Sequence, residues 1–202
     1  FTVGCRAARR SQPKQNENAV VFGAGTIGIA AAISLKHFGI KKVMIVDLSD
    51  FRLQKCKQLG FEICNSEKCD LKESMIEYFG EANSLHGKTA DVDIFIDAAG
   101  ADSILNTYQK IGKFESRLVV VAVNKGLKNI DILDLTYSQR SIIGSGGYMP
   151  EDVKDVMSIM ASKKYDIESI ITHEFSIKDL PKALQQAGKK DEALNVIIDF
   201  NK

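Results

Sequence analysis

Short runs of apolar residues alternate with longer, helix-like stretches between about residue 18 and residue 144. Each run is rich in Val and Ile and continuously apolar, which is typical of parallel strands that are buried on both faces. Strands separated by segments of helix length indicate repeated βαβ units. The pattern predicts an α/β fold with a doubly wound, six-stranded parallel sheet and helices on both faces. The expected strands are residues 19–22, 42–46, 61–64, 92–96, 118–123 and 141–144.

The segments between these strands have the lengths of crossover helices. In the first of them, Gly28, Ala31 and Leu35 recur with helical spacing, so that one helix face carries small side chains near its start. Core packing explains Gly28 less well than the other residues of this face, because a glycine inside a helix costs about 1 kcal/mol relative to alanine. The expected helices are residues 26–38, 50–59, 71–79, 101–111 and 132–139, and residues 1–12 are also helical in character.

The character of the sequence changes after Pro150, where the βαβ pattern ends. Two amphipathic helices are expected at residues 151–162 and 177–187, with strands at residues 170–175 and 194–199. This part is too short to be predicted as an independent domain. We therefore divide the chain into a lead-in helix and linker (residues 1–17), a main sheet domain (18–149) and a short C-terminal α/β extension (150–202).

The composition is that of a globular protein with nearly balanced charge. With 202 residues, 45% of them hydrophobic, the chain can form a core, and global disorder is excluded. Lys and Arg number 27 and Asp and Glu 26, so the net charge of +1 lacks the positive surplus typical of a nucleic-acid binder. The longest uncharged stretch, residues 18–35, contains three glycines and is too short for a membrane span. We expect neither a nucleic-acid partner nor membrane insertion.

Cysteine and histidine usage argues against a disulfide scaffold and against a metal site. Four cysteines are too few for such a scaffold, and no segment resembles a secretory signal, which favours the cytoplasm. Cys64 and Cys69 do not have a structural zinc spacing, and the three histidines are isolated from one another. The chain begins at Phe1 without a targeting sequence, so we expect it to be part of a longer polypeptide.

The sharpest motif is the glycine-rich loop GAGTIG at residues 23–28, between the first expected strand and the first expected helix. The glycine spacing alone is weak evidence for a nucleotide-binding loop, because glycines also occur in ordinary turns. Its place between a strand and a helix makes that evidence stronger. Gly23 permits the sharp turn, Gly25 lets a pyrophosphate approach the backbone, and Gly28 lets the helix lie close to the sheet. The phosphates would then meet the N–H groups at the positive end of the helix. The motif predicts a dinucleotide-binding Rossmann fold in which Gly23, Gly25, Thr26, Ile27 and Gly28 contact the cofactor.

Asp47 ends the next expected strand, nineteen residues after Gly28, where the ribose-binding acid of a dinucleotide fold is expected. A carboxylate there accepts hydrogen bonds from ribose hydroxyls and repels the 2′-phosphate of NADP, so we favour NAD. Arg52 complicates this preference. A nearby guanidinium could accept a 2′-phosphate, stack on adenine or pair with Asp47. The alternative for Asp47 alone is an ordinary solvated acid at a strand end.

Later strand ends should complete the site, because ligands of open α/β sheets bind beyond the carboxyl ends of the strands. Small residues follow three of these strands, at residues 98–100, 122–124 and 144–147. They would leave room for a cofactor, but tight turns need such residues for their own geometry. From these residues alone, turn and site remain equally open. Nothing in the chain indicates a catalytic nucleophile or a catalytic triad.

The whole pattern resembles the medium-chain dehydrogenase/reductase superfamily, and within it the zinc-dependent alcohol and polyol (sorbitol-like) dehydrogenases. The resemblance runs nearly from end to end, and the order and spacing of its segments are more specific than any one of them. The segments that carry it are residues 1–10 (FTVGCRAARR), 20–28 (VVFGAGTIG), 46–48 (VDL), 52–53 (RL), 57–60 (KQLG), 92–100 (VDIFIDAAG), 170–175 (IITHEF) and 194–198 (LNVII).

This resemblance implies an NAD-binding Rossmann domain whose C-terminal extension returns toward a GroES-like catalytic domain that is absent here. That domain would supply the zinc ligands, so this chain alone should be inactive. The complete protein would transfer a hydride between NAD and a secondary alcohol or polyol, with zinc as the Lewis acid. A homo-oligomer, a dimer or tetramer, is also implied. The cofactor-binding residues implied beyond the glycine loop are Asp47, Arg52, Ala98, Val121, Val123 and Ser145.

Two other functions remain possible from the sequence. A chain without catalytic ligands could be a non-catalytic module that binds or senses a dinucleotide. A methyltransferase also has a glycine-rich loop and an acidic strand end, but its G-x-G-x-G pattern wants a glycine where Ile27 stands. Binding of S-adenosylmethionine instead of NADH would favour the methyltransferase.

Overall fold

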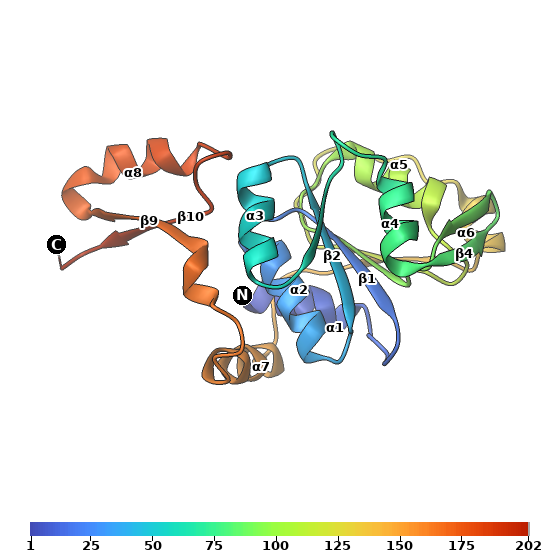
Figure 1. The fold of residues 1–202 in the computed structure, drawn as a ribbon, viewed down its shortest axis with the longest axis horizontal. Coiled ribbons are helices and arrows are strands. Elements are labelled where there is room, and N and C mark those ends of the chain that lie inside the picture. Colours follow the sequence, from blue (N-terminus) through green and yellow to red (C-terminus); the bar gives the residue numbers. More distant parts are fainter. Residues whose placement is uncertain (202) are drawn as a thin grey trace.

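A computed structural model, which describes residues 1–201, confirms the predicted six-stranded parallel sheet (Figure 1). The strand order is β3-β2-β1-β6-β7-β8, and every neighbouring pair is parallel. The chain therefore winds outward from β1 in one direction and then from β6 in the other, which is the Rossmann topology. The strands are β1 (Asn18–Phe22), β2 (Lys42–Asp47), β3 (Glu62–Asn65), β6 (Ile94–Asp97), β7 (Arg117–Val120) and β8 (Ser141–Gly144).

Helices connect these strands and cover both faces of the sheet. Three of them begin at a side chain that accepts a hydrogen bond from a backbone N–H of the first turn: Ser49, Asp70 and Asp131. Such caps satisfy N–H groups that have no partner inside the helix, which explains where these helices start. The helices are α1 (Thr2–Arg10), α2 (Thr26–His37), α3 (Asp50–Gln58), α4 (Leu71–Phe79), α5 (Asp102–Ile111), α6 (Ile132–Tyr137), α7 (Pro150–Ala161) and α8 (Leu180–Ala187).

The apolar core lies in two layers, one on each face of the sheet. Ala19 and Val21 of β1 belong to the first layer, whereas Val20 and Phe22 belong to the second. Successive strand residues point to opposite faces, so a strand between two helix layers must be apolar at every position. This is why the central strands are continuous apolar runs in the sequence.

Strand β7 is shorter than predicted. The sequence predicts a strand over residues 118–123, but the ladder with β8 ends at Val120. The N–H groups of Val121 and Ala122 both donate to the carbonyl of Asp97, each at 3.0 Å, so the chain turns out of the sheet here. Val121 and Val123 therefore lie in the loop after the strand, and this part of the prediction was wrong.

The sequence reading missed an antiparallel hairpin formed by β4 (Glu81–Ser84) and β5 (Gly87–Ala90). Most of its residues are exposed or half-buried, and only Thr89 and Ala90 are buried. A mainly polar, solvent-facing hairpin lacks the apolar run by which the other strands are found. Helix α8 also begins later than predicted, at Leu180, because residues 177–179 form a short 3₁₀ turn, η2 (Ile177–Asp179).

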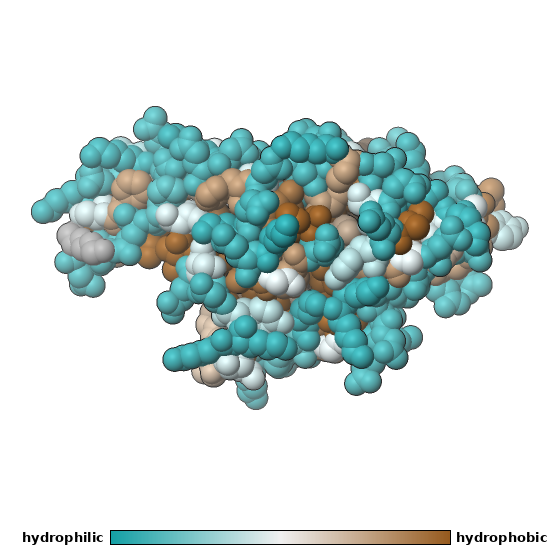
Figure 2. Space-filling view, in the orientation of Figure 1, coloured by the Kyte–Doolittle hydropathy of each residue, from teal (hydrophilic) through white to brown (hydrophobic). Residues whose placement is uncertain are grey.

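The end of the chain forms a small unit that projects from the sheet domain beyond α3 (Figure 1). After η1 (Ile167–Ile170), strands β9 (Ile171–Ser176) and β10 (Asn195–Asp199) pair in parallel, with α8 between them in sequence. Figure 2 shows a largely hydrophilic face with apolar patches over this unit and over the middle of the molecule. Leu180, Leu184 and Phe200 are among the exposed apolar residues of this unit.

Helix α1 is integrated into the core instead of lying on the surface. A Cβ at Gly4 would come within 2.5 Å of the Ile27 carbonyl oxygen, so α1 and α2 approach each other closely. Arg9 donates through Nε to Asp152 of α7 at 2.8 Å, and Asp152 is fully buried. The first ten residues thus join α2 and α7. None of the helices in residues 1–201 combines the length and the apolar character that a membrane crossing requires.

Candidate functional site

The glycine-rich loop lies at the carboxyl edge of the sheet, between β1 and α2. Gly23 has a φ of +103°, a conformation that L side chains rarely adopt, and its N–H donates to the Val46 carbonyl of β2 at 2.7 Å. A Cβ at Gly28 would lie 1.8 Å from the Gly23 carbonyl oxygen, which no side chain permits. An ideal Cβ at Gly25, in contrast, would meet no described atom within 4 Å. Two glycines are therefore required by the fold, and the third faces open space.

Helix α2 begins at this open space, and its start is not capped by any described side chain. Its N-cap is Gly25, and within the described chain no side chain accepts a hydrogen bond from the first turn. No acidic residue occurs in that turn either. The N–H groups and the positive end of a twelve-residue helix therefore point toward the surface, where an anion would be favoured.

The Asp47 carboxylate organises the loop that follows β2. One oxygen accepts the N–H of Ala24 at 2.6 Å, and the other accepts the N–H groups of Leu48 and Ser49 at 2.8 and 2.9 Å. The side chain thereby joins the end of β2 to the glycine-rich loop. Asp47 is half-buried beside that loop. The sequence places this acid correctly at the strand end, and the structure adds its contact with Ala24.

Arg52 does not pair with Asp47 in this structure. Its guanidinium Nη2 donates to the Ala193 carbonyl in the loop before β10, at 3.2 Å, and its buried Nε has no hydrogen-bond partner among the described residues. Ser49 makes a parallel contact, because its hydroxyl donates to the Lys190 carbonyl at 3.3 Å. The C-terminal unit therefore touches the same loop that holds Asp47.

A second contact joins the C-terminal unit to the start of α2. The Thr26 hydroxyl lies 3.1 Å from the Asn195 side-chain oxygen and donates to it. Thr26 is half-buried, whereas its neighbour Ile27 is 40% exposed. Sequence reasoning assigned Thr26 to the loop but gave no sign of a partner 169 residues away.

The exit of β6 packs against the glycine-rich loop. A Cβ at Gly23 would come within 3.1 Å of the backbone of Ala98 and Ala99, so these residues close the loop from the side. Asp97 is 4% exposed, and its Oδ1 accepts the N–H groups of Ala99 and Gly100 at 3.1 and 2.7 Å. The sequence reading missed the role of Asp97, although an acid at the end of an apolar strand is a signal for a turn-capping residue.

The exits of β7 and β8 are more open. Val123 is 87% exposed, and Val121 packs partly against the core. Ser145 is 9% exposed, its N–H donates to the Val120 carbonyl at 2.9 Å, and its hydroxyl has no partner among the described residues. A buried hydroxyl without a partner is costly, which makes Ser145 a candidate to contact a polar ligand group.

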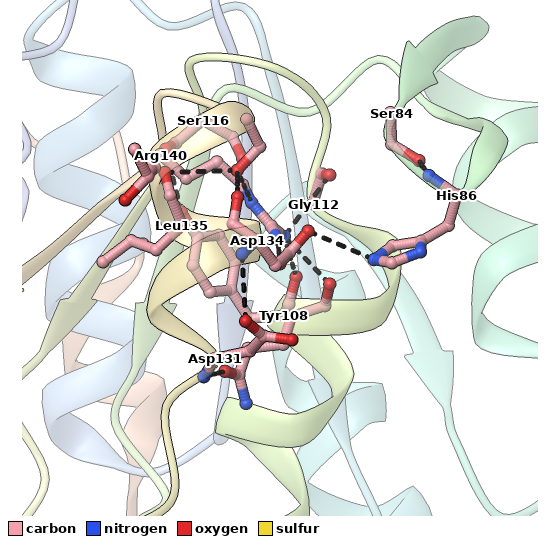
Figure 3. Close-up of polar contacts among 12 residues, drawn as sticks. Ser84, His86, Tyr108, Gly112, Ser116, Asp131, Asp134, Leu135 and Arg140 are labelled. Carbon is pink, nitrogen blue, oxygen red and sulfur yellow. Dashed lines mark hydrogen bonds and ion pairs between the residues drawn. The ribbon is translucent and has the colours of Figure 1, made fainter.

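A separate polar cluster joins the β4–β5 hairpin to α6 (Figure 3). Arg140, 1% exposed, pairs with Asp134 and donates to the Tyr108 carbonyl at 2.7 Å. His86, from the hairpin turn, points its Nε2 toward the free oxygen of Asp134 at 3.2 Å. Burial lowers the pKa of Arg140, which the neighbouring Tyr108 and Asp131 partly offset. The cluster borders a polar cavity of about 450 Å³, far along the sheet from the glycine-rich loop.

The described His, Cys, Asp and Glu side chains do not gather into a metal site. Within residues 1–201, no three His, Cys, Asp or Glu side chains are arranged to hold a metal ion. The histidines lie apart, as the sequence predicts: His86 pairs with Asp134, and His173 contacts Thr172 and Gln186.

The family model of zinc-binding dehydrogenases matches residues 26–162, which is more than half of the chain. The chain belongs to this zinc-binding dehydrogenase family. The match covers α2 through α7, and so includes most of the sheet and the exits of β6, β7 and β8.

The curated relatives that the chain resembles include sorbitol dehydrogenases. It is 28% identical over 184 residues to sorbitol dehydrogenase 1 of Saccharomyces cerevisiae, covering 91% of this chain and 51% of that protein. It is likewise 28% identical to sorbitol dehydrogenase of Rattus norvegicus, covering 98% of this chain and 54% of that protein. The chain thus spans about half the length of the curated relatives it matches.

Solved structures share the fold at lower identity. The crystal structure of 2R,3R-butanediol dehydrogenase from Bacillus subtilis superimposes with a TM-score of 0.83 at 24% identity, covering 98% of this chain and 55% of that one. An alcohol dehydrogenase from Escherichia coli CFT073, solved in complex with NADH, gives a TM-score of 0.82 over 97% of this chain and 56% of that one. These likenesses confirm the Rossmann-like architecture predicted from the sequence.

Proposed function

We propose that this chain is the NAD-binding part of an oxidoreductase that transfers a hydride between an alcohol carbon and the nicotinamide ring. The observation that carries the proposal is the contrast within the glycine-rich loop. Gly23 and Gly28 are fixed by close contacts, while Gly25 leaves open space at the uncapped start of α2. This is the arrangement that a pyrophosphate needs to reach backbone N–H groups.

In this proposal the loop residues and Asp47 hold the adenosine half of the cofactor. Backbone N–H groups of Gly25, Thr26 and Ile27 would donate to the pyrophosphate, and the half-buried carboxylate of Asp47 would accept from the ribose hydroxyls. The same charge would disfavour the 2′-phosphate of NADP. Arg52, whose Nη2 donates to the Ala193 carbonyl, would contribute to the ribose site beside Asp47.

The nicotinamide half would lie along the exits of β6, β7 and β8. Ala98 would line the cofactor beside the loop, Val121 and Val123 would contact the ring, and the unpartnered hydroxyl of Ser145 would meet its carboxamide. The bound nicotinamide supplies the hydride chemistry. The chain's own residues bind it, orient it and cover one side of it.

The substrate is proposed to be a secondary alcohol or polyol, in keeping with relatives named sorbitol dehydrogenase. The zinc in the family's name does not fit the side chains of residues 1–201, so its ligands would lie outside this chain. We therefore propose that residues 18–149 form the NAD-binding domain and that residues 150–202 return toward a catalytic domain. We also propose a homo-oligomer in the cytoplasm, with this chain inactive by itself.

Titration with NADH and, separately, NADPH tests the proposal, with Asp47→Ala measured beside the wild type. We expect NADH to bind more tightly than NADPH. Asp47→Ala should weaken NADH binding about 10- to 100-fold, because a hydrogen bond to a charged group is worth about 1.5–3 kcal/mol. NADPH binding should change much less, so the preference between the two cofactors should narrow.

Two further variants separate the cofactor contact from the fold. Asp47→Asn keeps an acceptor for the Ala24 N–H but removes the charge, and it should also narrow the preference for NADH. Asp91→Ala removes a carboxylate that pairs with Lys113 before β6, away from the loop, and should leave both affinities unchanged. Equal NADH and NADPH affinities that Asp47→Asn does not alter would contradict the proposed site.

A further inference from the structure

Two cysteine side chains meet at the turn between β3 and α4. Cys64 lies near the end of β3 and Cys69 just before the N-cap of α4, and their sulfur atoms are 2.9 Å apart. Cys64 is 3% exposed, whereas Cys69 is exposed. One thiol is therefore open to reagents in solution, and the other lies directly behind it.

The backbone of the turn holds this pair together. The N–H groups of Lys68 and Cys69 both donate to the Asn65 carbonyl, at 2.9 and 3.2 Å, which curls the turn back onto the end of β3. The Cys69 thiol also donates to that carbonyl at 3.1 Å. A disulfide requires sulfur atoms about 2.0 Å apart, so the two thiols need to approach by only about 1 Å.

The two other cysteines offer a contrast within the same chain. Cys5 and Cys56 are each 0% exposed in the apolar core. Burial raises the pKa of both thiols, to about 12 for Cys56, so both remain protonated at neutral pH. They therefore serve as internal controls for thiol chemistry at the turn.

We propose that Cys64 and Cys69 are a thiol–disulfide site, oxidised by low-molecular-weight disulfides of the glutathione type and restored by thiols. From the proposed function this inference uses only the cytoplasmic location, and it does not depend on NAD binding or on hydride transfer. Intracellular disulfides in ordinary proteins are usually transient and redox-sensing, and a pair with one exposed and one buried thiol suits that role.

The reaction takes place in two exchange steps. The Cys69 thiolate attacks one sulfur of oxidised glutathione, forming a mixed disulfide and releasing one glutathione thiolate, which takes up the proton that Cys69 lost. The Cys64 sulfur then attacks the Cys69 sulfur, breaks the mixed disulfide, and its proton leaves with the second glutathione. Two cysteine thiols and one oxidised glutathione thus give one protein disulfide and two glutathione thiols.

The environments of Cys64 and Cys69 indicate which thiol attacks the oxidant first. Burial, followed by the adjacent Cys69, raises the pKa of Cys64 to about 12, so Cys64 is a protonated thiol at neutral pH and a poor first nucleophile. The exposed Cys69 is therefore the residue that meets the oxidant. Once Cys69 is a mixed disulfide it bears neither a thiol nor a thiolate, which removes the contribution of its charge to the raised pKa of Cys64.

The turn is connected to the candidate site through Asn65. The Asn65 amide donates to the Leu48 carbonyl at 2.9 Å and to Asp50 at 2.7 Å, and both acceptors follow Asp47 in the chain. A disulfide would thus fix the turn that supports the Asp47 loop. The redox-sensitive bond would then lie in the turn that is hydrogen-bonded to the loop after Asp47.

Oxidation of the purified chain with excess oxidised glutathione tests the proposal by intact mass and peptide mapping. We expect the wild type to lose the mass of two hydrogen atoms, with a peptide linkage between Cys64 and Cys69 that dithiothreitol reverses. Cys64→Ser should stop at the first step and keep a glutathione adduct on Cys69. Cys69→Ser should react much more slowly than the wild type.

Cys56→Ser is the matched control, because it removes a buried cysteine without touching the turn, and it should form the linkage as the wild type does. A wild type that retains a stable glutathione adduct on Cys69, or that remains fully reduced, would overturn the proposal. The wild-type peptide map decides this even if a serine variant fails to fold.

Discussion

At the β1–β2 end of the sheet edge, a carboxylate accepts three backbone N–H groups and two glycines fit closely against their neighbours. At the β7–β8 end, Val123 is exposed and the Ser145 hydroxyl has no partner among the described residues. Both ends lie on the same edge of one sheet. The first is held by contacts within residues 1–201, while the second has an exposed valine and a buried hydroxyl without a partner among the described residues.

The two ends therefore represent two kinds of site, a preorganised loop and an open strand exit. A loop that is closed by hydrogen bonds and close packing is preorganised, so substitutions there should change folding and binding together. An open strand exit is shaped by what covers it, so substitutions there should leave the fold unchanged. The two ends can therefore be distinguished by whether a variant loses stability, affinity or neither.

The largest effect is expected from Gly28→Ala. The new Cβ would lie 1.8 Å from the Gly23 carbonyl oxygen, and that atom is backbone in a loop with few alternatives. Overpacking of this kind typically costs about 1–3 kcal/mol and sometimes more. We expect the midpoint of urea unfolding to fall and NADH binding to be lost with it, measured by circular dichroism and by cofactor titration.

Gly25→Ala is the matched variant, because its Cβ meets no described atom within 4 Å and its φ of −83° suits alanine. It should unfold at the wild-type urea concentration but bind NADH more weakly, since the methyl group occupies the space assigned to pyrophosphate. If Gly25→Ala bound NADH as the wild type does, the loop would not be the phosphate site.

A smaller effect is expected where the C-terminal unit touches the loop. Thr26→Val removes the hydroxyl that donates to Asn195 and should lower the unfolding free energy by about 0.5–1.5 kcal/mol. Combining it with Asn195→Ala in a double-mutant cycle should give a total below the sum of the two single changes. Strictly additive changes would show that the contact does not hold the unit in solution.

The smallest effect is expected at the open end. Val123→Ala alters a side chain that is 87% exposed, so the unfolding free energy should stay within about 0.5 kcal/mol of the wild type. Any decrease in NADH affinity should be smaller than that caused by Gly25→Ala. A fall of several kcal/mol in a urea titration would mean that this end is as tightly built as the other.

The sequence was sufficient to predict the parts of the molecule where one physical constraint acts alone. Strands buried between two helix layers must be apolar throughout, so their order and number could be predicted. Gly28 and Asp47 were singled out because a close backbone contact and a strand-end acid occur at a characteristic spacing. The structure shows the close approach at Gly28 and places Asp47 at the end of β2, while their roles toward a cofactor stay a prediction.

The features that sequence reasoning missed depend on distant or solvent-facing contacts. The β4–β5 hairpin has little apolar patterning, and β7 ends early because two N–H groups converge on the Asp97 carbonyl. The contact of Arg52 with Ala193 joins residues 141 positions apart. The spacing of Cys64 and Cys69 did not suggest a structural zinc site, and only the curled turn shows that their sulfur atoms meet.

The ion pair between Arg9 and Asp152 has a consequence for how the chain is made. These residues are separated by 143 positions, and Asp152 is fully buried beneath the guanidinium. During synthesis, α1 leaves the ribosome before α7, so it can reach its final place against α7 only after Asp152 has also been released. Until then α1 can pack only on α2, through the close approach at Gly4, so α1 is fixed late although it precedes the sheet in the chain.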